Sequence, residues 1–163
     1  MRQMSTAGRT LGGEVATRII LGTFRANGLL LSAGDELAAR EGLTAARWQV
    51  LGAVELAERA LTVPQIARRM GLARQSVHAT VRNLVDDGLL DFAANADHRR
   101  SPLVTTTVRG KQAYRALDRH QAAWVNELAA GLDDADLEIA AHVIDALCLR
   151  LDQIKADAKG TRQ

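Results

Sequence analysis

Side chains that can read nucleic-acid bases are concentrated between residues 74 and 83. Arg can bond guanine through two hydrogen bonds, Gln and Asn can do the same with adenine, and a Ser hydroxyl suits bases or phosphates. On a helix that turns about 100° per residue, Gln75 and Arg82 lie opposite an apolar arc that includes Val77 and Val81. The candidates for DNA contact are Arg74, Gln75, Ser76, His78, Arg82 and Asn83. The alternative is a polar helix face that contacts only solvent.

A second group of candidates lies a short distance further along, in a stretch that is typical of a loop tip, residues 95–100. Two adjacent guanidinium groups on an exposed loop suit the narrow, electronegative minor groove beside a recognition helix. An acidic neighbour, Asp97, is placed to orient one of them. The candidates in this loop are Asp97, His98, Arg99 and Arg100. The alternative is a solvated cluster of charges.

The elements that must position these side chains follow one another without interruption. Thr62 and Gln65 have the spacing of a capping box, which predicts the start of a short helix that ends at Gly71. Only three residues separate that helix from the next, expected over 74–87, and so short a turn forces the two helices to cross steeply. Two predicted strands follow, residues 89–92 and 103–108, and form a hairpin. This order predicts a winged helix-turn-helix.

The charge distribution agrees with that prediction. Residues 62–111 carry eight basic and four acidic side chains, a net charge of +4, whereas the whole chain carries +2. Because neutralisation of phosphates by Lys and Arg drives most nucleic-acid binding, a local excess matters more than the total. The middle of the chain is therefore the candidate DNA face.

Helical periodicity dominates the flanks of this segment. A helix is predicted from about residue 14 to residue 37, although its glycines at 22, 28 and 34 each cost roughly 1 kcal/mol relative to Ala. That helix is therefore irregular or broken. The glycines suit either a close crossing with a symmetry mate or a bend around the core. Thr44 is expected to cap a second helix, in which Trp48 belongs to the core.

Several classes of protein are excluded by what the sequence lacks. A single cysteine, Cys148, permits no internal disulfide and no cysteine-cluster zinc site, and His98, His120 and His142 are too scattered for a metal site. Charged residues interrupt every apolar run before it reaches the length of a membrane span, so we expect a soluble cytoplasmic protein. No nucleophile-elbow motif or phosphate-binding loop is present, so we expect no enzyme activity and no cofactor.

Four segments match the pattern of a known family, namely residues 61–67, 71–77, 84–89 and 97–100. In their order and spacing the chain resembles the multiple antibiotic resistance regulator (MarR) family. The chain departs from the family at Ala73, where a helix-capping Ser is common, and at Thr106 and Val108, where Leu and Pro are common. The wing register is also open, because either Arg99 or Arg100 can take the position of the arginine that enters the groove.

The resemblance implies a mainly α-helical single domain over 1–163, with a small β-wing, a winged helix-turn-helix region over 44–108 and dimerisation helices over 11–40 and 110–157. The last two helices are expected over 110–130 and 134–155, and Asp133 is expected to cap the second of them. The second helix carries an apolar stripe, which indicates contact with a partner. The expected dimerisation residues are Ile19, Leu137, Ile144, Leu147, Leu151 and Ile154.

The resemblance also implies a function. A homodimer binds a pseudo-palindromic operator in double-stranded DNA, usually as a repressor, and a small aromatic ligand between the dimer helices and the winged region releases it. Phe24, Arg47 and Trp48 are near enough to such a crevice to be considered, but a core or surface position is favoured for each of them. Two alternatives remain: a thiol-oxidation-responsive regulator acting through Cys148, and a winged helix used for protein–protein contact.

Overall fold

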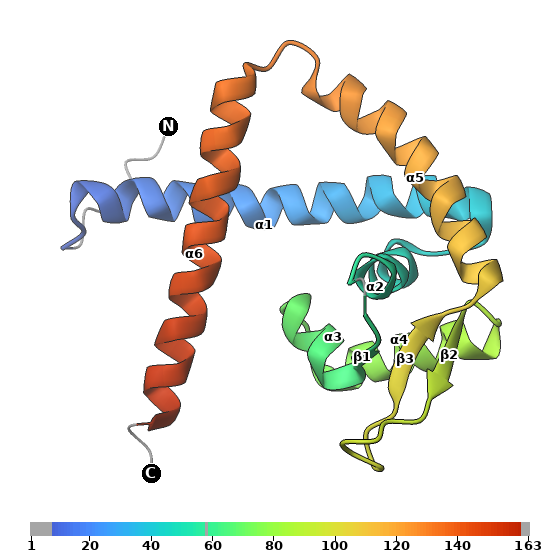
Figure 1. Ribbon diagram of the computed structural model, residues 1–163. Coiled ribbons are helices and arrows are strands. Elements are labelled where there is room, and N and C mark those ends of the chain that lie inside the picture. The colour runs from blue at the N-terminus through green and yellow to red at the C-terminus, as the bar shows by residue number, and fades with distance from the viewer. Residues whose placement is uncertain (1–7, 58, 161–163) are drawn as a thin grey trace. The chain divides into compact units, whose positions relative to one another are not determined.

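The computed structural model describes residues 8–57 and 59–160 (Figure 1). By its internal contacts the chain divides into two compact units, one ending at Gln121 and the other beginning at Ala122. The elements of the first unit are α1 (Leu11–Ala38), the 3-10 helix η1 (Ala39–Glu41), α2 (Ala45–Glu55), β1 (Leu61–Thr62), α3 (Val63–Arg69), α4 (Arg74–Asp86), β2 (Leu90–Ala93) and β3 (Leu103–Thr106). Helix α5 (Val108–Ala129) begins in the first unit and ends in the second, which also contains α6 (Asp134–Gly160).

Helix α1 is continuous, so its glycines neither break it nor end it. The side chain of Thr10 caps it by accepting a hydrogen bond from the backbone nitrogen of Gly13 at 3.1 Å. Gly34 has a packing role, because a Cβ added there would lie 3.1 Å from the Cβ of Ala45 at the start of α2. Absence of a side chain at Gly34 therefore lets α1 approach α2 closely.

The helix-turn-helix forms as its capping residues predict. Gln65 Oε1 accepts hydrogen bonds from the backbone nitrogen of Thr62 at 2.7 Å and from its hydroxyl at 3.0 Å, which fixes the start of α3. The chain then turns at Gly71, whose φ of 64° is in the left-handed region that glycine favours. Ala73 stands at the N-cap of α4 and provides no side-chain hydrogen bond.

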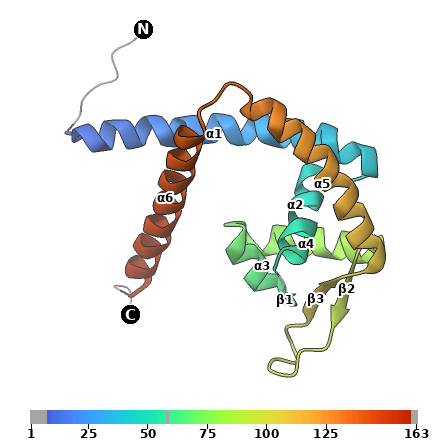
Figure 2. The ribbon, with the colours of Figure 1, turned by 45° about the horizontal axis from the view of Figure 1, so that its top comes forward.

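The wing differs in three details from its prediction. Strand β3 lies between β1 and β2 and is antiparallel to both, so the sheet has a third strand that the sequence pattern did not indicate (Figure 2). Strand β2 covers Leu90–Ala93 rather than residues 89–92, and β3 ends at Thr106 rather than at residue 108. Thr107 explains this early end: its hydroxyl donates to the carbonyl of Gly88 at 2.8 Å and accepts from the nitrogen of Gly110 at 3.0 Å. That side chain starts α5 two residues earlier than predicted.

The hydrophobic core lies where α2, α3 and α4 meet the sheet. Its largest fully buried side chains are Leu51, Ile66, Leu84, Leu90, Leu117, Val50, Val77, Val81 and Val104. Trp48 is partly buried and packs against this cluster, as expected. The predicted cap of α2 is also confirmed, since Thr44 Oγ1 accepts from the nitrogen of Arg47 at 3.3 Å. The core thus holds α4 by its apolar face and leaves its polar face exposed to solvent.

The second unit is dominated by a single long helix. Asp133 Oδ1 accepts from the nitrogen of Ala135 at 2.8 Å, which confirms the predicted cap of α6. Among the α6 side chains that the structure describes, only that of Leu147 is partly buried, and the others are exposed. None of the described helices is both long and apolar enough to cross a membrane.

Candidate nucleic-acid interface

The two faces of α4 differ in burial as their residue types predict: the apolar face is buried and the polar face is exposed. Val77, Val81 and Leu84 are at most 1% exposed and belong to the core. All six candidate side chains are exposed: Arg74, Gln75, Ser76, His78, Arg82 and Asn83. Within the described part of the chain none of these side chains is engaged in a hydrogen bond or an ion pair. Their donors and acceptors are therefore available to another molecule.

The wing loop presents its four candidates, Asp97, His98, Arg99 and Arg100, to solvent as well. The loop is closed by Asn95, whose Nδ2 donates to the carbonyl of Ser101 at 2.7 Å and whose Oδ1 accepts from the nitrogen of Asp97 at 3.1 Å. In the described residues the Asp97 carboxylate forms no ion pair with either arginine, so the expected orienting contact is absent. Asn95 organises the loop instead, through the short-range bonds that make Asn common in turns.

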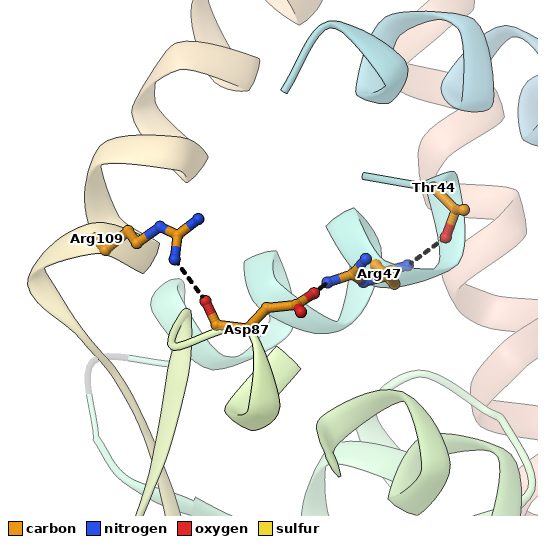
Figure 3. A network of polar contacts seen from close by, with 4 residues as sticks. All are labelled: Thr44, Arg47, Asp87 and Arg109. Atoms are coloured by element: carbon orange, nitrogen blue, oxygen red, sulfur yellow. Dashed lines mark hydrogen bonds and ion pairs between the residues drawn. The ribbon is translucent and has the colours of Figure 1, made fainter. Parts of the chain in front are cut away.

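The C-terminal end of α4 is tied to two other helices by Asp87 (Figure 3). The Asp87 carboxylate pairs with Arg47 Nη2 on α2, and its backbone carbonyl accepts from Arg109 Nη1 on α5 at 2.8 Å. Because these residues lie 40 and 22 positions away from Asp87, no local pattern in the sequence indicated the contact. Arg47, one of the residues considered for a ligand crevice, is thus paired with a carboxylate of its own chain.

The start of α5 is held against the winged region by two close approaches. A Cβ added at Gly110 would lie 2.0 Å from the carbonyl oxygen of Leu89, and one added at Gly52 would lie 3.1 Å from Tyr114 Cε2. Burial raises the pKa of Tyr114, and the carboxylates of Asp118 and Glu55 raise it further. Tyr114 therefore stays neutral, and its ring packs against α2 at Gly52.

A pocket of about 510 Å³ opens beside the Asp87 contacts. Neither Phe24 nor Trp48, the two aromatic residues considered for a ligand crevice, lines it, and Phe24 is 70% exposed on α1. The pocket is lined by Glu41, Gly42, Leu43, Arg47, Asp87, Leu89, Arg109, Gln112 and Ala113. Its walls combine charged and amide side chains with a small apolar patch, so they suit a polar small molecule.

The expected dimerisation residues are largely uncovered in the single chain. On α6, Leu137, Ile144, Leu151 and Ile154 are between 38% and 58% exposed. Leu147, also on α6, and Ile19 on α1 are partly buried. Cys148 is exposed on α6. In the part of the chain that is described, no group of three or more His, Cys, Asp or Glu side chains is placed to hold a metal ion.

Comparison with known proteins identifies relatives over most of the chain. A family model described as the MarR family matches residues 41–101. The chain is 42% identical over 128 residues to Rv2011c of Mycobacterium tuberculosis, covering 78% of this chain and 87% of that protein. It is 27% identical over 145 residues to the transcriptional activatory protein BadR of Rhodopseudomonas palustris, covering 87% of this chain and 81% of BadR.

Solved structures share the fold at lower sequence identity. The transcriptional regulator MosR of M. tuberculosis, in complex with DNA, matches with a TM-score of 0.70 and 22% identity, covering 83% of this chain and 96% of MosR. CouR of Rhodococcus jostii RHA1, bound to p-coumaroyl-CoA, matches with a TM-score of 0.71 and 18% identity, covering 86% of this chain and 96% of CouR. At these identities the likeness shows a common fold.

Proposed function

Because the chain belongs to the MarR family of transcription regulators, we propose that it binds an operator as a homodimer and represses nearby genes until a small aromatic ligand releases it. The observation that carries this proposal is the division of α4, whose apolar face is buried while six base-reading side chains are exposed. The core holds one face of this helix, and the polar side chains on the other face have no partner in the described part of the chain. They can therefore contact bases in the major groove.

The proposed contacts divide between the two grooves of DNA. Gln75, Arg82 and Asn83 on α4 have the donor and acceptor patterns that distinguish bases in the major groove, and Arg74, Ser76 and His78 contact bases or phosphates beside them. The exposed Arg99 and Arg100 at the wing tip enter the minor groove, with Asp97 and His98 beside them. MosR, which has the same fold, was solved in complex with DNA, and this supports the proposal.

The proposed dimer explains why so much apolar surface is uncovered. Contiguous exposed apolar side chains on a soluble protein mark an interaction surface, and α6 carries four of them on its stripe. In the proposed dimer these residues of α6, with Leu147 and with Ile19 of α1, contact a second copy of the chain. Two copies related by a two-fold axis read a pseudo-palindrome whose half-sites lie about 10 base pairs apart, or a multiple of that.

The proposal also states whether the protein represses or activates transcription and which kind of ligand it binds. CouR has p-coumaroyl-CoA bound in its structure, which supports an aromatic effector, whereas BadR is named an activatory protein. An effector changes DNA occupancy only if it binds the DNA-competent and the incompetent dimers with different affinity. We propose repression, since a dimer that overlaps a promoter blocks transcription without any further contact. The proposed protein has no catalytic step.

Fluorescence anisotropy tests this function directly. The purified protein is titrated into DNA that flanks its own gene and into a scrambled duplex, each at several salt concentrations. We expect salt-sensitive binding with a clear preference for the native DNA, because phosphate neutralisation releases counterions and base contacts add specificity. A transcription assay with the same DNA then shows whether the bound protein represses or activates the gene. Equal, weak binding to both duplexes would contradict the proposal and favour a winged helix used for protein contact.

A further inference from the structure

A hollow of about 340 Å³ opens beside α3, and its walls carry three guanidinium groups. They belong to Arg59, Arg68 and Arg69, all of which are exposed. In the described part of the chain no acidic side chain lines this hollow, and none of the three arginines forms an ion pair. The folded chain therefore gathers three positive charges at one place without compensating them.

The amide of Gln65, which also lines the hollow, is oriented so that it can only donate. Its Oε1 already accepts two hydrogen bonds from Thr62, in the cap of α3. Its Nε2 has no hydrogen bond among the described residues. An amide nitrogen offers two donors and a guanidinium offers five, without any acceptor. The polar side chains around the hollow thus present donors alone, which suits a bound oxyanion.

The position of two arginines at a helix end explains only part of this charge. Arg68 and Arg69 lie in the last turn of α3, where the helix dipole favours cations. Arg59 precedes β1 and belongs to no helix, yet it lines the same hollow. The buried Leu61 follows two residues later and pairs with Val104, which holds this segment beside α3. An anion among the three guanidinium groups would relieve their repulsion.

The hollow and the wing lie at opposite ends of α4. The turn over residues 70–73 joins α3 to the start of α4, whereas the end of α4 leads into β2 through a hydrogen bond from the nitrogen of Leu89 to the carbonyl of Leu84 at 2.8 Å. Both α3 and β2 contact α4 (Figure 2). A helix in the major groove has a phosphate backbone on each side, and phosphate contacts fix its orientation there. The hollow is therefore placed beside the backbone that the wing does not reach.

We propose that the hollow binds a phosphate of the DNA backbone, on the side of the major groove away from the wing. Arg68 and Arg69 donate to the phosphate oxygens, and Arg59 adds positive charge from the segment before β1. With the wing on one side and the hollow on the other, α4 is held at a fixed angle between two anchors. This inference rests on the proposed function and adds residues outside α4 and the wing to the DNA interface.

Anisotropy on the native and the scrambled duplex, at several salt concentrations, tests this contact with the double variant Arg68→Gln/Arg69→Gln. We expect the log–log salt slope to flatten by roughly 0.9 on both duplexes, because one phosphate contact is lost and base sequence plays no part in it. The ratio of the two affinities should not change. The matched control, Arg115→Gln/Arg119→Gln, removes the same charge from exposed positions of α5 and should keep the slope. Arg68→Lys/Arg69→Lys keeps the charge and should also keep it.

Ethylation of single phosphates locates the contact on the DNA. In the wild type, ethylation of the phosphate in the hollow should weaken binding, because a neutral triester no longer attracts a guanidinium. This one signal should disappear in Arg68→Gln/Arg69→Gln. In Arg99→Ala/Arg100→Ala it should stay, while signals across the major groove disappear. An unchanged salt slope in the α3 variant, or loss of the same phosphate signals in both variants, would overturn the proposal.

The same measurements separate this contact from the proposed function. A wild type that prefers its native DNA, with a salt slope independent of Arg68 and Arg69, would keep the function and remove the contact. A wild type that binds both duplexes equally would remove the function, whereas a slope that still depends on the two arginines would keep the phosphate contact. Thermal melting shows whether each variant is folded, and we expect no change because the substituted side chains are exposed.

Discussion

Helices α4 and α6 are both amphipathic, but α4 buries its apolar face whereas α6 leaves its apolar side chains exposed. In α4, Val77, Val81 and Leu84 are buried in the core and the polar side chains face solvent. In α6, apolar side chains such as Ile144 and Leu151 are 38% and 55% exposed in the single chain. The exposed chemistry of each helix identifies what it can bind: hydrogen-bonding groups on α4 suit nucleic-acid bases, whereas hydrocarbon on α6 suits another protein surface.

The comparison also separates two sources of stability. Helix α4 is held by side chains of its own chain, so its position does not depend on a second copy. The apolar face of α6 finds no comparable cover among the described residues, and most stability of a helix comes from burial of such a face. In the proposed dimer, the apolar face of α6 is buried against the second copy, whereas the apolar face of α4 is already buried within its own chain.

The largest expected effect is on association through α6. Ile144→Asp places a charge in the proposed interface, where an uncompensated buried charge costs on the order of 3–5 kcal/mol, and two-fold symmetry introduces it twice. We expect a monomer at micromolar concentration in sedimentation velocity. The matched control is Gln153→Asp, on the opposite face of the same helix, since nine residues correspond to about half a turn beyond two full turns. A dimer that survives Ile144→Asp would show that this face of α6 is not the interface.

The next effect is on the core beneath α4. Leu84 is fully buried, and Leu84→Ala should lower the free energy of unfolding by about 2–5 kcal/mol, because it removes buried hydrocarbon and leaves a cavity. Urea denaturation at a fixed protein concentration measures this change. Leu72→Ala makes the same substitution at a residue that is 49% exposed, and it should have a much smaller effect. Equal losses in the two variants would contradict the assignment of the buried face.

Base reading by α4 should show a smaller but specific effect. If Arg82 bonds a base through two hydrogen bonds, Arg82→Ala relaxes the preference at one base pair by about 1–3 kcal/mol. The measurement compares the affinities for the operator and for single-base-pair variants of it. Arg115→Ala removes the same charge from an exposed residue of α5 and should leave the preference unchanged. Unchanged preference in Arg82→Ala and in Gln75→Ala would show that the groove-facing arc is assigned wrongly.

The smallest effect concerns the wing. If Arg99 or Arg100 neutralises a phosphate, its replacement by Ala should flatten the log–log salt slope by roughly 0.9. Measurement of the two single variants also decides which arginine enters the groove, a question that the register of the wing leaves open. Arg115→Ala and Arg119→Ala, both at exposed positions of α5, provide matched controls. A slope that neither wing variant changes would exclude both arginines as phosphate ligands.

Local chemistry made much of this fold predictable. The contact between Thr62 and Gln65 and the caps at Thr44 and Asp133 each depend on residues within three positions of one another, so the spacing alone indicated them. The two faces of α4 likewise follow from a single periodicity. Such short-range signals were sufficient to predict a helix-turn-helix with a wing.

Contacts between distant residues were not predictable in the same way. Strand β1 is only two residues long and exists because Leu61 pairs with Val104 on β3. Thr107, which resembled a strand residue, takes a capping role because its hydroxyl reaches the carbonyl of Gly88. The pairing of Arg47 with Asp87 requires α2 and α4 to be packed first. No periodicity in the sequence specifies which of many charged residues meet after folding.

The proposed arrangement of two α4 helices is tested most directly by the spacing of half-sites in the operator. Anisotropy is measured on duplexes that carry one half-site, two half-sites at their native spacing, or two half-sites separated by about 5 additional base pairs, which places the second on the opposite side of the DNA. We expect the native pair to bind far more tightly than the other two, because a single dimer then inserts both recognition helices. Equal affinity for all three duplexes would contradict a dimer that reads DNA through α4.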